Sequence, residues 1–155
     1  MTIFIAADHR GFKLKNKLIK WLKSQKYQVI DCGNTIYDPE DDYPDFVKLV
    51  VKHLTMRNHA KHSTKQHEMG VLICGSGVGV SIASNRFRGV RCALGFNAKQ
   101  IKHARENDHI NVLALAADYI SLTTAKTFVK TFLTTEPIMK EKYLRRIRKT
   151  DMGNL

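Results

Sequence analysis

Hydrophobic residues along this chain form short, nearly continuous runs that alternate with longer amphipathic segments. The short hydrophobic runs have the length of strands that are buried on both faces of a sheet. They cover residues 2–7, 27–33, 69–74, 90–96 and 111–116. Elsewhere hydrophobic residues recur at helical spacing, over residues 11–26, 44–54, 80–85, 98–106, 121–133 and 137–149. This alternation predicts a single α/β domain over residues 1–155, with three layers and a five-stranded parallel sheet between helices.

Polar residues at the strand ends indicate where a site should lie. Sheets of this kind bind ligands at the carboxyl ends of their strands, near the topological switch point. Asp8 and His9 follow the first predicted strand, and the segment 74–79 follows the third. We expect the polar segment 107–111 to join them, although it lies on a helix-to-strand connection.

The turn after the third strand carries the strongest chemical signal. Cys74 ends that strand, and the turn consists of Gly75, Ser76, Gly77, Val78 and Gly79. Glycines let backbone N–H groups approach a ligand closely, and a helix N-terminus adds donors and partial positive charge. Such a turn suits a phosphate or a developing oxyanion, and it favours a thiolate at the cysteine. Its sequence is neither a Walker A motif nor a dinucleotide-binding motif. The alternative is an inert core cysteine above ordinary turn glycines.

Composition narrows the function classes. The formal net charge is +12, with basic residues concentrated at 13–26 and 140–149. Neither segment matches a nucleic-acid-reading motif, so solvated helix faces are favoured over a nucleic-acid surface, and attraction of anionic metabolites is compatible. No apolar run approaches the ~20 residues of a membrane span, and no signal peptide is visible.

The cysteines and histidines outside the turn carry weaker signals. Cys32 and Cys92 lie in strand-like runs and are interpreted as core residues, and an odd number of cysteines without CxxC spacing favours a reducing, cytoplasmic location. A polar segment holds His59, His62 and His67, a spacing loosely like that of metal ligands. No cysteine or carboxylate pattern accompanies them, so we expect a surface segment and no metal site.

Several motifs occur together in a characteristic order. They are Ala-Asp-His-Arg-Gly-Phe-Lys-Leu-Lys at 7–15, Asp-Tyr-Pro-Asp at 42–45 and Ile-Cys-Gly-Ser-Gly-Val-Gly at 73–79, continued by 85–91 and 104–106. Over about residues 2–150 the chain thereby resembles the type B ribose-5-phosphate isomerases and the related galactose-6-phosphate isomerase subunits. The resemblance implies a flavodoxin-like, Rossmann-like fold and a homodimer with shared sites, the C-terminal helix packing on the partner. It also implies no metal or organic cofactor, and isomerisation of ribose 5-phosphate through a cis-enediolate.

The resemblance also implies the catalytic roles. Cys74 occupies the position of the base that moves a proton between C1 and C2 of the sugar. The amides of Gly75–Gly79 and the Ser76 hydroxyl would donate hydrogen bonds to the enediolate oxygen.

Substrate-binding roles follow from the same resemblance. Asp8 would hold sugar hydroxyls, and Tyr43 would line the pocket. His9 would bind the phosphate together with Lys142 and Arg146, which are one helical turn apart. Related chains usually have arginine at both helical positions, and lysine lacks the bidentate fork.

One segment departs from the family pattern. Related chains read Glu-His-Asn-Asp-x-Asn before the fifth strand, and their histidine opens the sugar ring. This chain has Asn107 at that histidine, Asp108 where asparagine is usual, and His109 two residues further on. Three explanations are open. His109 opens the ring, or His9 or a water does so. Alternatively, the preferred substrate differs or is taken in its open-chain form. His109 is the candidate taken forward, and the alternative is a loop or interface histidine.

These observations leave three function hypotheses. The leading one is a phosphosugar aldose–ketose isomerase acting on ribose 5-phosphate. The second is a galactose-6-phosphate isomerase-type subunit acting on a six-carbon phosphosugar. The third is a non-catalytic protein that binds anionic metabolites or nucleic acid through its basic surface.

Overall fold

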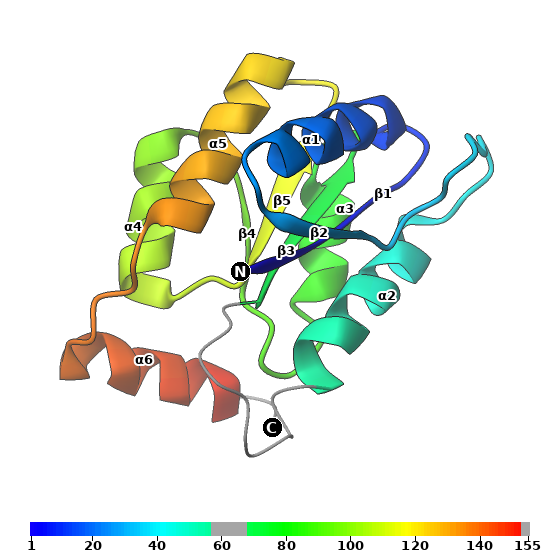
Figure 1. Ribbon diagram of the computed structural model, residues 1–155. Coiled ribbons are helices and arrows are strands. Elements are labelled where there is room, and N and C mark those ends of the chain that lie inside the picture. The colour runs from blue at the N-terminus through cyan, green and yellow to red at the C-terminus, as the bar shows by residue number, and fades with distance from the viewer. Residues whose placement is uncertain (57–67, 153–155) are drawn as a thin grey trace.

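The computed structural model describes residues 1–56 and 68–152 (Figure 1). His59, His62 and His67 lie outside the described residues, so the expected surface segment stays a prediction. Across the described ranges, no helix has the length and apolar character needed to cross a bilayer. In those same ranges, no three His, Cys, Asp or Glu side chains are grouped in a way that could hold a metal ion.

The described residues form a five-stranded, all-parallel sheet with strand order β2-β1-β3-β5-β4. This confirms the predicted α/β architecture. The strands are β1 (Thr2–Ala7), β2 (Gln28–Asp31), β3 (Glu68–Cys74), β4 (Cys92–Leu94) and β5 (Val112–Ala116). The last two strands are interchanged relative to the 2-1-3-4-5 order of flavodoxin. From β1 the chain moves first to one side and later to the other, so the topological switch point lies between β1 and β3.

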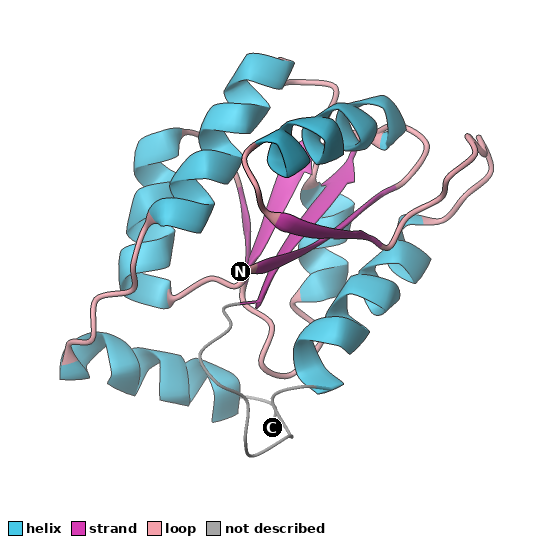
Figure 2. Ribbon diagram, in the orientation of Figure 1, coloured by secondary structure: helices cyan, strands magenta, loops and turns pink. Residues whose placement is uncertain are grey.

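Helices cover both faces of the sheet (Figure 2). The helices are α1 (Phe12–Ser24), α2 (Tyr43–Met56), α3 (Val78–Ser84), α4 (Ala98–Asp108), α5 (Leu122–Thr134) and α6 (Glu141–Met152). Side chains from α1, α4 and α5 join the apolar cluster on one face, and those from α2 and α3 join the cluster on the other. Figure 1 shows α6 apart from both layers, beyond the end of the sheet at which the strands begin.

Helix α6 begins at Glu141 rather than at the predicted residue 137. The preceding segment is held in a non-helical conformation by contacts with the end of α4. Ile138 N–H donates to the Glu106 carbonyl at 2.9 Å, and the His109 ring contacts the Ile138 carbonyl at 3.2 Å. The sequence pattern missed this because the competing hydrogen bonds come from a helix about thirty residues away.

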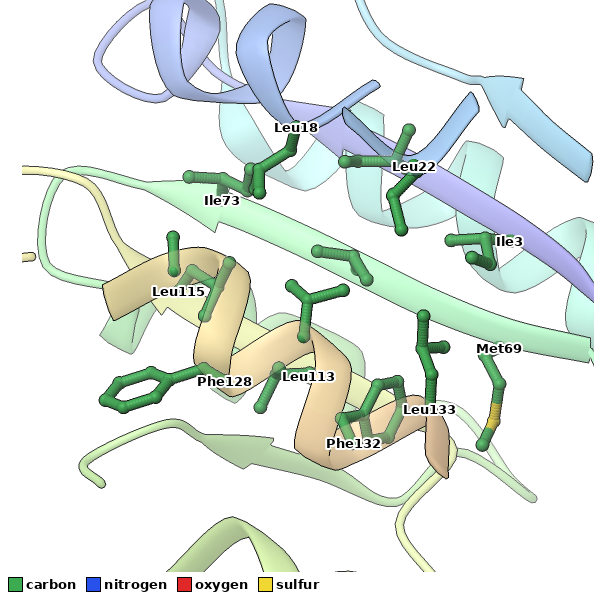
Figure 3. Close-up of a cluster of buried hydrophobic side chains, with 14 of the residues drawn as sticks. Ile3, Leu18, Leu22, Met69, Ile73, Leu113, Leu115, Phe128, Phe132 and Leu133 are labelled. Carbon is green, nitrogen blue, oxygen red and sulfur yellow. The ribbon is translucent and has the colours of Figure 1, made fainter. Parts of the chain in front are cut away.

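Two apolar clusters stabilise the layers. The larger one lies under α1 and α5, where Leu18 lies near Ile73, and Phe132 lies near Leu113 and Leu133 (Figure 3). The smaller one lies under α2, and Cys32 and Cys92 pack against it as half-buried thiols. Burial raises the pKa of Cys32 to about 11 and that of Cys92 to about 12. The sequence predicts both as core residues, but the structure places them at the margin of the cluster, where each is only partly buried.

Candidate active site

Strand pairing brings the first two polar segments together. In the parallel register of β1 with β3, Ala7 lies opposite Ile73, and the Asp8 N–H donates to the Ile73 carbonyl at 3.2 Å. Asp8 and Cys74 therefore leave neighbouring strands at the same edge of the sheet. This is the switch point between β1 and β3, where a ligand site was expected.

The turn after β3 wraps around the thiol of Cys74. Cys74 is only 4% exposed, and its Sγ accepts a hydrogen bond from the Gly77 N–H at 3.1 Å. The Val78 N–H contacts Ser76 Oγ at 3.3 Å, and α3 begins at Val78. Gly77 has φ +73°, a left-handed conformation that glycine adopts without strain. The sulfur is thus fixed next to an amide donor, at the start of a short helix.

Glycine lets neighbouring groups lie directly against this turn. A Cβ at Gly75 would lie 2.6 Å from both Arg10 Nε and Asp118 Oδ2. A Cβ at Gly79 would lie 2.8 Å from the ring of Tyr43, the first residue of α2. Tyr43 therefore lies beside the turn, and its role as a pocket-lining residue stays a prediction.

Asp8 and His9 are held by separate hydrogen bonds. The Asp8 side chain is buried and accepts the Gly11 N–H at 3.0 Å, and burial raises its pKa above the ordinary value. His9 contacts one oxygen of Asp41 twice, through its backbone N–H at 2.8 Å and its ring Nδ1 at 2.9 Å. The hydrogen bond to Asp41 raises the pKa of His9.

Sequence reasoning missed three residues of this edge. Asp41 comes from an acidic loop and has no motif of its own. Arg10 and Asp118 form an ion pair at 2.6 Å, and the Asp118 N–H donates to the Gly75 carbonyl at 3.0 Å. Asp118 is the second residue after β5, so the strand-end rule that selected Asp8 would also have found it.

The expectation that 107–111 would join Cys74 within one chain is wrong. Val112 pairs with Gly70 and Ala116 with Cys74, so the segment enters the sheet at the amino end of β5. Four residues of strand separate the two ends, roughly 13 Å at about 3.3 Å per residue. The physical reason is the connection itself: in a parallel sheet, a helix that leads into a strand returns the chain to the amino edge.

The remaining predicted residues gather at this amino edge. Asn107 and Asp108 end α4, and His109 follows with φ +50° and its ring on the Ile138 carbonyl. Lys142 and Arg146 are exposed on α6. Asp108 and Arg146 both line a cavity of about 520 Å³ between α6 and the start of β4.

The predicted site residues therefore form two sets, at opposite edges of a Rossmann-like sheet. One set surrounds a buried thiol at the switch point, and the other is basic and lies near α6. Over residues 3–150 the sequence matches the family described as Ribose/Galactose Isomerase, and the chain belongs to that family.

Relatives with similar sequences include ribose-5-phosphate isomerases. The chain is 43% identical to a probable ribose-5-phosphate isomerase B of Mycoplasma pneumoniae, over 76% of this chain and 72% of the relative. It is 32% identical to ribose-5-phosphate isomerase B of Mycobacterium leprae, over 95% of this chain and 86% of the relative.

Solved structures show the same likeness. Ribose-5-phosphate isomerase B of Mycoplasma genitalium, with bound ribulose 5-phosphate, has a TM-score of 0.87 and 35% identity, covering 97% of this chain and 94% of that one. The type B enzyme of Trypanosoma cruzi has a TM-score of 0.87 and 28% identity, with the same coverage.

The space around Gly77 can be tested with a matched glycine. Gly77 and Gly89 have similar positive φ values, but a Cβ at Gly89 meets nothing within 4 Å. At Gly77 it would lie 2.4 Å from a Leu94 methyl and 3.1 Å from the backbone carbon of Leu115. We expect Gly89→Ala to lower the free energy of unfolding by about 1–2 kcal/mol and Gly77→Ala by about 1–3 kcal/mol more. Urea unfolding followed by circular dichroism measures both, and equal losses would contradict the close packing at Gly77.

Proposed function

We propose that this protein is a ribose-5-phosphate isomerase that interconverts ribose 5-phosphate and ribulose 5-phosphate through a cis-enediolate. The observation that carries the proposal is the Cys74 thiol, which is buried at the switch point with an amide donor on its sulfur and with the Asp8 carboxylate just beyond the end of the neighbouring strand. Membership of the Ribose/Galactose Isomerase family supports it, as does the similar Mycoplasma genitalium enzyme with bound ribulose 5-phosphate.

Cys74 acts as the base in this proposal. An aldose–ketose isomerase removes the proton from C2 of the open-chain aldose and returns it to C1 of the enediolate. The Gly77 N–H donates a hydrogen bond to the sulfur of Cys74 and fixes its position in the turn. The amides of the 75–79 turn and the Ser76 hydroxyl stabilise the negative charge that develops on the enediolate oxygen.

The substrate is held from both ends. Asp8 accepts hydrogen bonds from sugar hydroxyls, and the Tyr43 ring forms the wall beside Gly79. The phosphate is bound by His9 together with Lys142 and Arg146. The net charge of +12 attracts a phosphorylated substrate, and the reaction needs no metal or organic cofactor. This chemistry belongs to a cytoplasmic metabolic enzyme, and nucleic acid is not its partner.

A homodimer with shared sites completes the arrangement. Cys74 and the residues at α6 lie at opposite edges of one sheet, so they act on one substrate only across a subunit interface. In the dimer, Asn107, Asp108 and His109 of one subunit approach the Cys74 turn of the other, and α6 packs on the partner with Lys142 and Arg146.

The role of Cys74 is tested by Cys74→Ser, with Cys32→Ser as the matched control. Serine keeps the shape, but its hydroxyl stays protonated near neutral pH and cannot take the C2 proton, so turnover of ribose 5-phosphate should fall by about 10²–10⁴-fold while the fold is retained. Cys32→Ser should behave like wild type, because Cys32 lies apart from the turn and its raised pKa keeps it a thiol.

A coupled assay with ribose 5-phosphate and circular dichroism give the two readouts. Wild-type turnover in Cys74→Ser would contradict the assignment of the base. Running the same assay with a six-carbon phosphosugar decides between the ribose and galactose alternatives, and a preference for the hexose would overturn the proposed substrate.

Shared sites predict complementation between two inactive variants. Cys74→Ser and Arg146→Ala should each lose activity, one through the base and the other through phosphate binding. After the subunits are mixed and exchanged, each heterodimer has one intact site, so about a quarter of wild-type activity should return. If the activity of the mixture stays at that of the separate variants, all site residues come from a single chain.

Ring opening is assigned to His109 of the partner subunit, in place of the family histidine that is Asn107 here. His109→Asn should slow turnover of the cyclic sugar. Asparagine tolerates the left-handed conformation at this position, so the loss of stability should be limited to about 0.5–1.5 kcal/mol, for the lost contact with the Ile138 carbonyl. The test compares the coupled assay on wild type and variant. Unimpaired turnover would show that another group opens the ring.

A further inference from the structure

A continuous set of polar contacts connects buried Lys15 in α1 with the ring of His9. Lys15 Nζ lies 2.9 Å from the Asn34 carbonyl oxygen. The side-chain amide of Asn34 donates to Asp41 Oδ2 at 3.2 Å, and Asp41 Oδ1 contacts His9 Nδ1 at 2.9 Å. Four residues from three segments of the chain therefore form one hydrogen-bonded path that ends at the candidate active site.

The inner end of this path is fixed by an ion pair between a buried lysine and an exposed aspartate. The Lys15 side chain is 0% exposed, and its Nζ lies 2.8 and 2.6 Å from the two carboxylate oxygens of Asp31. A buried ammonium is costly unless it stays paired and hydrogen-bonded. Moving Asn34 would break one of those bonds, so the position of Asn34 is strongly determined.

The outer end is fixed by Asp41. Its side chain is 6% exposed, and both of its oxygens are used: Oδ2 accepts from Asn34, and Oδ1 contacts the backbone N–H and the ring of His9. A carboxylate held at both oxygens has one orientation. It therefore holds the imidazole at Nδ1 and turns Nε2 away from Asp41.

We propose that Asp41 is a positioning residue for phosphate binding, which acts through His9 by fixing its ring so that Nε2–H donates to the substrate phosphate. This inference rests on the proposed function, in which His9 is a phosphate ligand. Asn34 and Lys15 in turn hold Asp41 in place.

Charge strengthens this arrangement. The hydrogen bond to Asp41 is the largest cause of the raised pKa of His9; Asp8 also raises it, and Arg10 lowers it. A raised pKa keeps the imidazolium, which binds a phosphate dianion best, to higher pH. Without the Asp41 charge, the pKa of His9 falls, and the imidazolium is lost at lower pH.

The central test is Asp41→Asn, which keeps an acceptor oxygen but removes the charge. The KM for ribose 5-phosphate should rise about ten- to a hundred-fold, the range for losing a charge-assisted hydrogen bond, with a smaller change in kcat. The alkaline fall of kcat/KM should move to lower pH. Asp38→Asn is the control: it removes a charge from the same loop, where exposed Asp38 accepts only the Glu40 N–H among the contacts of the described residues.

A double-mutant cycle separates positioning from loop stability. If Asp41 acts through His9, adding Asp41→Asn to His9→Asn costs little more than His9→Asn alone. Additive losses, or a loss in kcat with an unchanged KM, would overturn the inference. Asn34→Ala keeps the backbone carbonyl that Lys15 binds and removes only the donor to Asp41. Asn34→Ala should raise KM less than Asp41→Asn does. It replaces Asp41→Asn as the test variant if that protein does not fold.

Two measurements do not depend on turnover. In Asp41→Asn, the pKa of His9, measured by NMR titration of its ring, should be lower than in wild type. The affinity for inorganic phosphate should also decrease. If neither changes, the inference is wrong. If wild type fails to isomerise ribose 5-phosphate while these two changes occur, the proposed function fails and the positioning role of Asp41 stands.

Discussion

The parallel pairing of β1 with β3 is the constraint on which the rest of the site depends. These two strands are central, their residues are almost all buried, and their register sets Asp8 beside the end of β3. A shift of one residue would turn every side chain of a strand to the other face of the sheet and would separate the carboxylate from the thiol. Buried apolar side chains on both faces therefore determine the relative position of two polar groups at the edge.

Around this fixed pair, the other groups are positioned by contacts between loops. Tyr43 lies against Gly79, Asp118 binds the Gly75 carbonyl and Asp41 binds His9. Each of these contacts joins a different loop to the edge formed by β1 and β3. The proposed catalytic groups are therefore positioned in two ways: strand pairing sets Asp8 and Cys74, and independent loop contacts set the groups around them.

The elements of the fold could be predicted from sequence because buried parallel strands and amphipathic helices have different hydrophobic periods. The position of Cys74 and Asp8 followed from the rule on strand ends. The location of 107–111 at the amino edge did not follow, since it depends on the direction in which α4 returns the chain to β5. Asp41 and Arg10 were missed because their partners, His9 and Asp118, are distant in sequence, and loop-to-loop contacts have no periodicity.

The short outer strands have a consequence for how copies of this chain can meet. The sheet is bounded by β2 with four residues and β4 with three. Unpaired strand edges are templates for intermolecular pairing, and short ones offer few backbone groups for it. The sheet therefore gives little opportunity for edge-to-edge pairing with other copies, whether in fibrils or by strand swapping. The proposed homodimer would therefore form through side-chain surfaces of helices and loops, which allow a closed and specific pairing in place of open-ended growth.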